Sequence, residues 1–201
     1  MTCMQAALPI GTMRGVLLTA LLVSGGGAAH AENATYAIDP THTFVTFDID
    51  HAGLSTVRAR FDRTQGTVTL DKAGRTGAAD ITIDLGSVST GVPALDTRLT
   101  GKDFLNAAEV PTARFVADRF GFDGDKVTDV AGTLTLLGRS RPVTLKAIRF
   151  NCYFSPMLRR ETCGGDFEAT LVRSQFGMLD RLDAGVSDQI RLLIQIEAIR
   201  Q

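Results

Sequence analysis

The chain has 201 residues, of which 44% are hydrophobic, and it carries 21 Lys and Arg against 22 Asp and Glu. Basic residues are scattered along a near-neutral chain, which gives no broad positive surface for nucleic acids or anionic membranes. The length fits one domain large enough for a core or for a core with a cavity.

The first 31 residues have the pattern of a secretory signal peptide. Arg14 precedes an apolar run over residues 16–23, and Ala29-His30-Ala31 forms a small-residue cleavage pattern before Glu32. The run is too short to span a bilayer, so a retained membrane anchor is the weaker alternative. We therefore expect an exported domain over residues 32–201.

After Glu32 the chain alternates apolar and polar residues, with the period of two that is typical of half-buried strands. Turn signals with Gly and Asp separate these stretches by short connections, which predicts antiparallel pairing. The expected strands cover residues 45–50, 57–62, 66–70, 79–85, 113–120, 126–137, 141–150, 165–172 and 190–199.

Residues 92–108 break this alternation. Pro93 stands where helices favour proline, and Leu95, Leu99 and Leu105 have a spacing compatible with a helix. We expect a short helix followed by a loop, which could cap one end of the sheet.

About eight antiparallel strands must either pack against another sheet or close into a barrel, because open edges promote aggregation. The chain has no Trp and lacks the Cys…Trp…Cys spacing of immunoglobulin-like sandwiches, which favours the barrel. The interior of such a barrel is either filled with side chains or able to hold one small ligand.

Cys152 and Cys163 are the two cysteines within residues 32–201, and they lie eleven positions apart. An even pair in an exported chain favours a structural disulfide in a hairpin. A redox-active pair usually has C-x-x-C spacing, and a metal site would need further ligands nearby.

Several motifs, in their order and spacing, resemble the YceI-like domain family across most of residues 36–198. They are Tyr36-x-Ile38-Asp39-x-x-His42, Val45-x-Phe47, His51-Ala52-Gly53, Ser89-Thr90-Gly91 with Asp96, Leu99, Asp103-Phe104, Pro111 and Phe115, Gly132-Thr133-Leu134-Thr135-Leu136-x-Gly138 with Pro142-Val143, Arg173-Ser174-x-Phe176-Gly177-Met178, and Val186-Ser187-Asp188. Leu95 and Arg98 depart from the family pattern, which usually has arginine and histidine at these two positions.

This resemblance implies an all-β, lipocalin-like, extended antiparallel barrel with a short helix between strands. It also implies a periplasmic carrier, not an enzyme, that uses no cofactor and holds a long isoprenoid, quinone-type or similar lipid in an apolar tunnel. An inner-membrane protein is a further candidate partner, nucleic acid is not expected, and the oligomeric state is open between monomer and homodimer.

The expected ligand-binding residues are mostly inward-facing apolar positions of the strands, with a few in turn-adjacent segments. They are Val45, Phe47, Ile49, His51, Phe61, Ile81, Ile83, Phe104, Phe115, Leu134, Leu171, Arg173, Phe176, Met178, Leu192 and Ile194. We expect Phe104, Phe176 and Met178 to shape a mouth or a tunnel wall.

Three polar residues have two open interpretations. His42 and His51 are structural residues near strand ends or contacts for a ligand head group. Arg173 either pairs with Asp39, Asp96 or Asp188, or faces a head group. The sequence shows no G-x-S-x-G or H-E-x-x-H motif, so a hydrolase is the less favoured alternative beside a ligand-free structural or stress-response barrel.

Overall fold

The structure is a computed structural model that describes residues 1–2 and 33–201. The predicted signal peptide therefore lies almost entirely outside the described residues. Among the described residues, no helix is long and apolar enough to cross a membrane.

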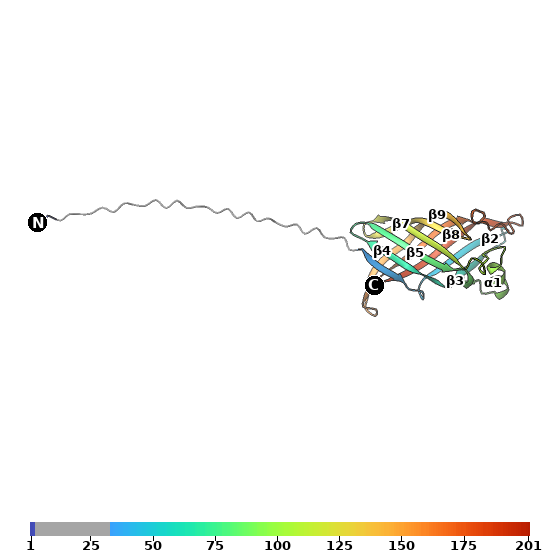
Figure 1. Ribbon diagram of the computed structural model, residues 1–201, viewed down its shortest axis with the longest axis horizontal. Coiled ribbons are helices and arrows are strands. Elements are labelled where there is room, and N and C mark those ends of the chain that lie inside the picture. Colours follow the sequence, from blue (N-terminus) through green and yellow to red (C-terminus); the bar gives the residue numbers. More distant parts are fainter. Residues whose placement is uncertain (3–32) are drawn as a thin grey trace. The chain divides into compact units, whose positions relative to one another are not determined.

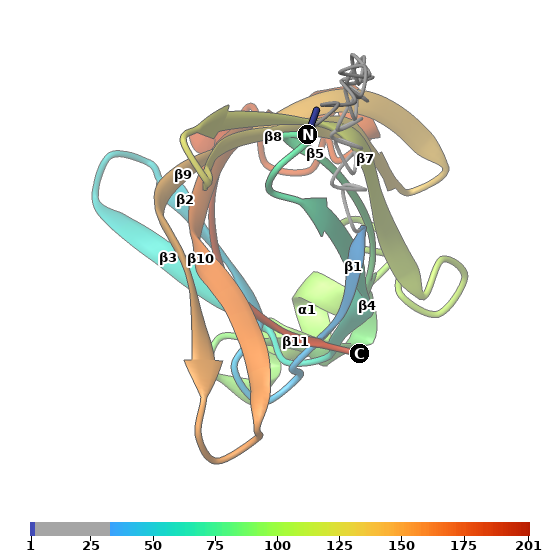
Figure 2. The same cartoon turned by 90° about the vertical axis from the view of Figure 1, so that its left-hand side faces the viewer.

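Residues 34–200 form one antiparallel sheet that closes on itself, as Figures 1 and 2 show. The closed order is β1-β4-β5-β7-β8-β9-β10-β11 and back to β1, while β2, β3 and β6 extend the sheet from β11. The strands are β1 (Ala34–Ile38), β2 (Phe44–His51), β3 (Ser55–Phe61), β4 (Thr64–Asp71), β5 (Thr76–Asp84), β6 (Val88–Ser89), β7 (Thr112–Asp123), β8 (Lys126–Leu136), β9 (Arg139–Ser155), β10 (Arg160–Val172) and β11 (Val186–Arg200). The predicted lipocalin-like antiparallel barrel is confirmed.

The described residues contain one α-helix, α1 (Pro93–Thr100), and two 3-10 helices, η1 (Leu85–Ser87) and η2 (Arg173–Phe176). Pro93 begins α1, as the sequence predicts, because its missing N–H costs nothing at a helix start. In Figure 2 the helix lies across the far end of the barrel. The turns after α1 lead into β7, so the predicted helix and loop within residues 92–108 are confirmed.

Several strands predicted from alternation are longer than expected, among them β9 and β10. β9 and β10 continue past residues 150 and 165 to form a hairpin that projects beyond the rim, with Arg160 opposite Ser155 at its last pair. Residues 152–163 are therefore continuous with the barrel wall. The ladder places Cys163 directly opposite Cys152, and the structure joins them in a disulfide.

Along one edge, the two ends of β11 pair with different strands. Residues 198–200 pair with β1, whereas Val186 and residues 190–195 pair with β2. β1 and β2 are separated by a turn in which Asp39 accepts hydrogen bonds from the backbone and hydroxyl of Thr41. The break lets β1 close the barrel against β4 while β2 and β3 flare outward (Figure 2).

The tight curvature of the sheet requires glycine at Gly66 in β4. Its φ is +154°, and a Cβ at this position would lie 2.2 Å from the carbonyl oxygen of Asp80 on β5. Only glycine permits this close approach of two backbones.

Candidate functional site

The barrel interior holds two apolar cavities, of about 520 Å³ and about 120 Å³. The larger, the wide cavity, lies toward α1 and is bounded partly by Leu95, Leu99 and the segment after η2. The smaller, the narrow cavity, lies toward the β9–β10 hairpin and includes Phe150 and Cys163 in its wall. An interior solidly filled with side chains would leave no such space.

Four residues line both cavities: Val45, Ile83, Leu134 and Leu192. They come from β2, β5, β8 and β11, which lie around the barrel, and each projects inward by strand alternation. We call this ring the waist, because it is where the two cavities adjoin. A long flexible chain that occupied both cavities would pass through it.

Fifteen of the sixteen predicted ligand-binding residues line one or both cavities. In addition to the waist, the wide cavity includes Phe47, Ile49, His51, Phe61, Phe104, Leu171, Arg173 and Met178, and the narrow cavity includes Ile81, Phe115 and Ile194. Phe176 is buried but lines neither cavity. It ends η2 and belongs to the buried apolar core.

Arg173 is the buried cation of the wide cavity, with only 2% of its surface exposed. Its Nε donates to the carbonyl oxygen of Ser187 at 2.9 Å, its Nη1 to Met178 at 3.0 Å, and its Nη2 to Val186 at 3.2 Å. Burial lowers the pKa of this guanidinium, against the opposing effects of Asp188 and Asp180. Of the two interpretations left open by the sequence, direct ion pairing with Asp39, Asp96 or Asp188 is not observed among the described residues, and Asp188 acts on Arg173 through its charge.

A gap in the ladder explains this arrangement. The pairing of β11 with β2 shifts register between Val186 and Ile190, so residues 187–189 have no partner on β2. At the start of this gap Arg173 donates to the carbonyl oxygens of Val186 and Ser187. Asp188, within the gap, accepts hydrogen bonds from the backbone and hydroxyl of Ser174. Buried carbonyls need such donors. Arg173 thus positions the segment that forms one wall of the wide cavity.

The accessible polar groups of the wide cavity lie on its rim. Arg98 on α1 donates to Asp180 at 3.1 Å and lies over the ring of Phe104, with 5.5 Å between the guanidinium carbon and the ring centroid. Arg181 lies 3.8 Å from the same carboxylate, and His51 ends β2 beside the cavity. These side chains are half-exposed or exposed, so they could meet the polar end of a ligand whose tail lies inside.

His42 has a different position. It lines neither cavity and lies on the outer surface, where its Nδ1 is 2.8 Å from Oδ2 of Asp39. The hydrogen bond and charge of Asp39 raise the pKa of His42. His42 therefore matches the structural interpretation of the two that the sequence left open.

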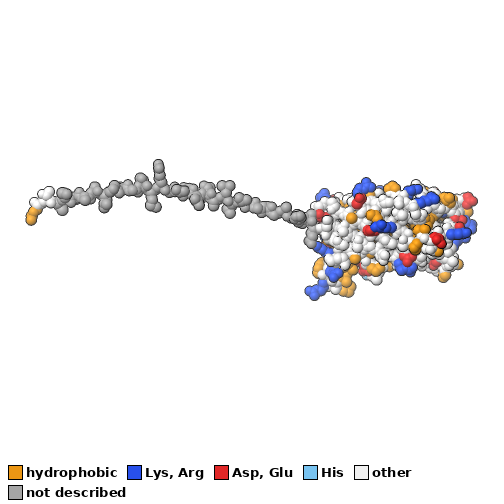
Figure 3. All heavy atoms as spheres, viewed as in Figure 1, with side chains coloured by type: hydrophobic (Ala, Val, Ile, Leu, Met, Phe, Trp, Pro, Cys, Tyr) orange, Lys and Arg blue, Asp and Glu red, His pale blue; other side chains and the backbone are white. Residues whose placement is uncertain are grey.

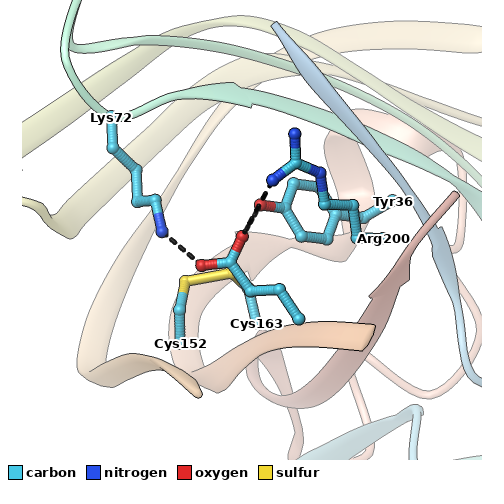
Figure 4. Close-up of a disulfide and its surroundings, with 6 residues drawn as sticks. Tyr36, Lys72, Cys152, Cys163 and Arg200 are labelled. Carbon is cyan, nitrogen blue, oxygen red and sulfur yellow. Dashed lines mark hydrogen bonds and ion pairs between the residues drawn. A yellow bond between two sulfur atoms is a disulfide. The ribbon is translucent and has the colours of Figure 1, made fainter. Parts of the chain in front are cut away.

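A polar cluster crosses the other end of the barrel (Figure 4). Glu161 on β10 accepts hydrogen bonds from Lys72 and from the hydroxyl of Tyr36 on β1, and one of its oxygens lies 3.8 Å from Arg200. Burial raises the pKa of Glu161, but the hydrogen bonds from Lys72 and Tyr36 outweigh it and hold the pKa below its usual value. This Glu161 cluster ties β10 to β1 and to the end of β4 beside the disulfide.

Sequence reasoning missed the cavity residues that lie outside regular alternation. Arg181 and Ala184 come from the irregular segment before β11, and Leu85 comes from η1. Such segments have no period from which an inward face could be predicted. Tyr36 could have been found, because β1 alternates with the period of a strand.

The fold and these cavities define a lipocalin-like barrel with an apolar interior and a polar rim. The family model for the YceI-like domain matches residues 36–198, and this chain belongs to that family. It is 34% identical over 196 residues to a UPF0312 protein of Pseudomonas aeruginosa and 33% identical to protein YceI of Escherichia coli O157:H7, in each case with 94% of this chain and 98% of the relative covered.

Solved structures show the same fold. The Burkholderia cenocepacia protein BcnA has a TM-score of 0.65 at 23% identity, covering 80% of this chain and 98% of that chain. A YCEI protein from Campylobacter jejuni has a TM-score of 0.64 at 24% identity, covering 76% and 90%. A polyisoprenoid binding domain from Saccharophagus degradans has a TM-score of 0.57 at 17% identity, covering 83% and 98%.

Proposed function

We propose that this protein is a periplasmic carrier that binds a long isoprenoid or isoprenoid-quinone lipid inside its barrel. The observation that carries this proposal is the pair of apolar cavities that adjoin at the waist. They form a lining for an elongated, apolar molecule rather than a compact one.

Burial of a lipid tail supplies the affinity in this proposal. Each methylene moved from water into the barrel contributes about 0.8 kcal/mol, so a tail of several isoprene units needs few polar anchors. Branched aliphatic and Phe side chains dominate both walls, which suits a methyl-branched chain. The Saccharophagus domain, which binds a polyisoprenoid and shares this fold, agrees with that ligand class.

The tail enters the narrow cavity and the head group stays at the rim of the wide cavity. Arg98, Arg181 and His51 offer N–H donors there, and carbonyl oxygens of a quinone accept such bonds. Phe104 below Arg98 provides an aromatic surface beside the head group. Arg173 has its three contacts within the protein, so its role is to position the wall.

The periplasmic location rests on the predicted signal peptide over residues 1–31, with residues 32–201 as the mature YceI-like domain. The disulfide between Cys152 and Cys163 agrees with an oxidising compartment. Exchange of cargo with an inner-membrane protein follows from a role as carrier, because isoprenoid lipids reside in membranes.

The first experiment is native mass spectrometry of protein recovered from the periplasm, followed by extraction and identification of bound lipid. We expect a co-purifying prenyl chain. A protein free of lipid under gentle conditions, with no uptake of added prenyl lipid, would overturn the proposal and favour a ligand-free structural barrel.

A pair of variants separates cavity binding from surface adhesion. Ala113 is buried in the wall of the wide cavity, so Ala113→Phe fills space without adding charge. Its exposed neighbour on β7 gives the matched control, Thr112→Phe. We expect Ala113→Phe to lower lipid occupancy at least about tenfold, given the loss of buried methylenes, while the control retains it. Equal occupancy in both variants would place the lipid outside the barrel.

A further inference from the structure

Several large apolar side chains are exposed to solvent at the tip of the β9–β10 hairpin. Within the hairpin tip, which we define as residues 153–160, Met157 is 88% exposed and Phe154 is 65% exposed, and Tyr153 and Leu158 are also exposed. Exposed apolar side chains that gather at one place mark an interaction site. In Figure 3 hydrophobic and basic side chains lie together on the hairpin that projects below the barrel.

These side chains point in several directions. Phe154 lies opposite Glu161 and Tyr153 opposite Thr162, so alternation sends the two rings to opposite faces of the hairpin. Met157 and Leu158 follow in the turn that joins the strands. A flat protein surface would cover only one face of such a tip, whereas a membrane interface surrounds it on every side.

The charge of the hairpin tip complements an anionic bilayer. Its sequence ends in Arg159 and Arg160, both exposed, and contains no acidic residue. The next residue, Glu161, is engaged by Lys72 and Tyr36 at the barrel end. Although the whole chain has no broad basic surface, this tip is locally cationic. Apolar side chains beside Tyr and Arg are typical of membrane-interface anchors.

The hairpin tip is held in shape before it meets a partner. The disulfide between Cys152 and Cys163 joins the strands at its base. In the turn, the backbone N–H of Arg159 donates to the carbonyl of Ser155 at 2.8 Å, and that of Leu158 donates to Oγ of Ser155 at 3.3 Å. A preordered tip loses little conformational freedom when it binds.

We propose that the hairpin tip docks the barrel onto anionic phospholipid bilayers, with Met157, Leu158, Phe154 and Tyr153 in the interfacial layer and Arg159 and Arg160 at the lipid phosphates. This surface is separate from the cargo cavities and from the polar rim near α1. Its test needs no cargo, so its outcome is independent of the proposed function.

The chain contains no Trp, so a single introduced Trp reports on its own surroundings. We would compare Met157→Trp with Leu54→Trp, since Leu54 is 84% exposed in the β2–β3 turn. Both proteins are purified in the same way, and their intact masses verify that they have the same N-terminus. They are mixed with vesicles of phosphatidylglycerol and phosphatidylcholine in equal parts, or of phosphatidylcholine alone.

We expect a blue shift of Met157→Trp emission and its quenching by brominated acyl chains in the anionic vesicles, with no change for Leu54→Trp. Replacing Arg159 and Arg160 by Gln should weaken vesicle binding about 30-fold, as for two cations near a charged surface, and Met157→Ser with Leu158→Ser at least about tenfold.

Two outcomes would overturn the proposal. Unchanged Met157→Trp emission with vesicles excludes insertion of the tip. A blue shift that depends on protein concentration and appears without vesicles would assign the hairpin tip to contact with a second copy of the chain.

Discussion

The two halves of the barrel interior are built differently. The wide cavity, of about 520 Å³, is bounded by α1, the segment after η2 and the flared β2 and β3, in addition to the continuous sheet. The narrow cavity, of about 120 Å³, is bounded almost entirely by strands and by the rings of Phe115, Phe120, Phe150, Phe167 and Tyr36.

This difference in wall construction explains why the wide cavity is larger than the narrow cavity. Side chains of an eight-stranded sheet nearly fill the barrel by themselves when many of them are aromatic. Where irregular segments replace part of the wall, the wall moves outward and leaves room. The wide half therefore depends on hydrogen bonds that hold irregular backbone in place, and the narrow half depends on packing and cross-links between strands.

The largest expected effect comes from the wide half. Arg173→Met leaves one buried and two partly buried carbonyl oxygens without their donor, which should reduce the free energy of unfolding by about 4 kcal/mol. Urea denaturation measures this loss. Arg181→Met, at the half-exposed rim, is the control and should change stability little. Equal loss in both variants would show that Arg173 has no special role in holding the segment.

The next effect belongs to the narrow half. Cys152→Ser with Cys163→Ser removes the disulfide and should reduce stability by about 3 kcal/mol in the chain-entropy description. Lipid binding to the wide cavity should persist below the melting temperature, because the cross-link lies at the other end. Reduction of the unmodified protein should reproduce the loss of stability. Loss of all lipid binding at low temperature would mean that the two halves do not act separately.

The waist offers a smaller effect that links the two halves. Leu134→Phe narrows it and should lower affinity for long prenyl chains about tenfold, while short chains that fit the wide cavity alone keep their affinity. Competition between prenyl alcohols of increasing length measures this. Thr133→Phe, on the outer face of the same strand, is the matched control. Equal weakening for short and long chains would contradict passage through the waist.

The smallest effect is the pH dependence of the Glu161 cluster. The pKa of Glu161 lies below its usual value, so its contribution to stability is present above about pH 4.5 and is lost as the pH falls through the folded pKa. Burial, and then the hydrogen bond to Glu161, raise the pKa of Tyr36 to about 12, so its contribution is lost as the pH rises from about 10 toward 12. Thermal melts across pH test both limits. Glu161→Gln should flatten the acid limb, and an unchanged acid limb would assign it to other carboxylates.

Alternation was sufficient to predict most of the barrel and much of its interior. Phe47, Phe115 and Leu192 face inward because a strand inside a closed sheet has only two faces, and each of them follows a polar or charged residue in the sequence. Periodicity alone does not distinguish a closed barrel from a sandwich. The resemblance of the motifs to the family supplied the prediction of a barrel. The helix within residues 92–108 was recognisable from Pro93 and the spacing of its leucines.

The parts that could not be predicted depend on contacts between distant or irregular segments. The partners of Arg173 are backbone carbonyls, and no sequence pattern records which carbonyls a register shift leaves unpaired. Phe176 was predicted to shape the tunnel, yet it is buried in the core and lines neither cavity. The division of the interior into two cavities depends on how side chains of four separate strands meet at the waist.

The pairing of β1 with β11 determines when the barrel can close during folding. Residues 36–38 find their partners at residues 198–200, at the opposite end of the chain. The barrel cannot close until its last strand has been synthesised, so contacts of high sequence separation must form late and slowly. Both cavities therefore take their final form only after β11 has paired with β1.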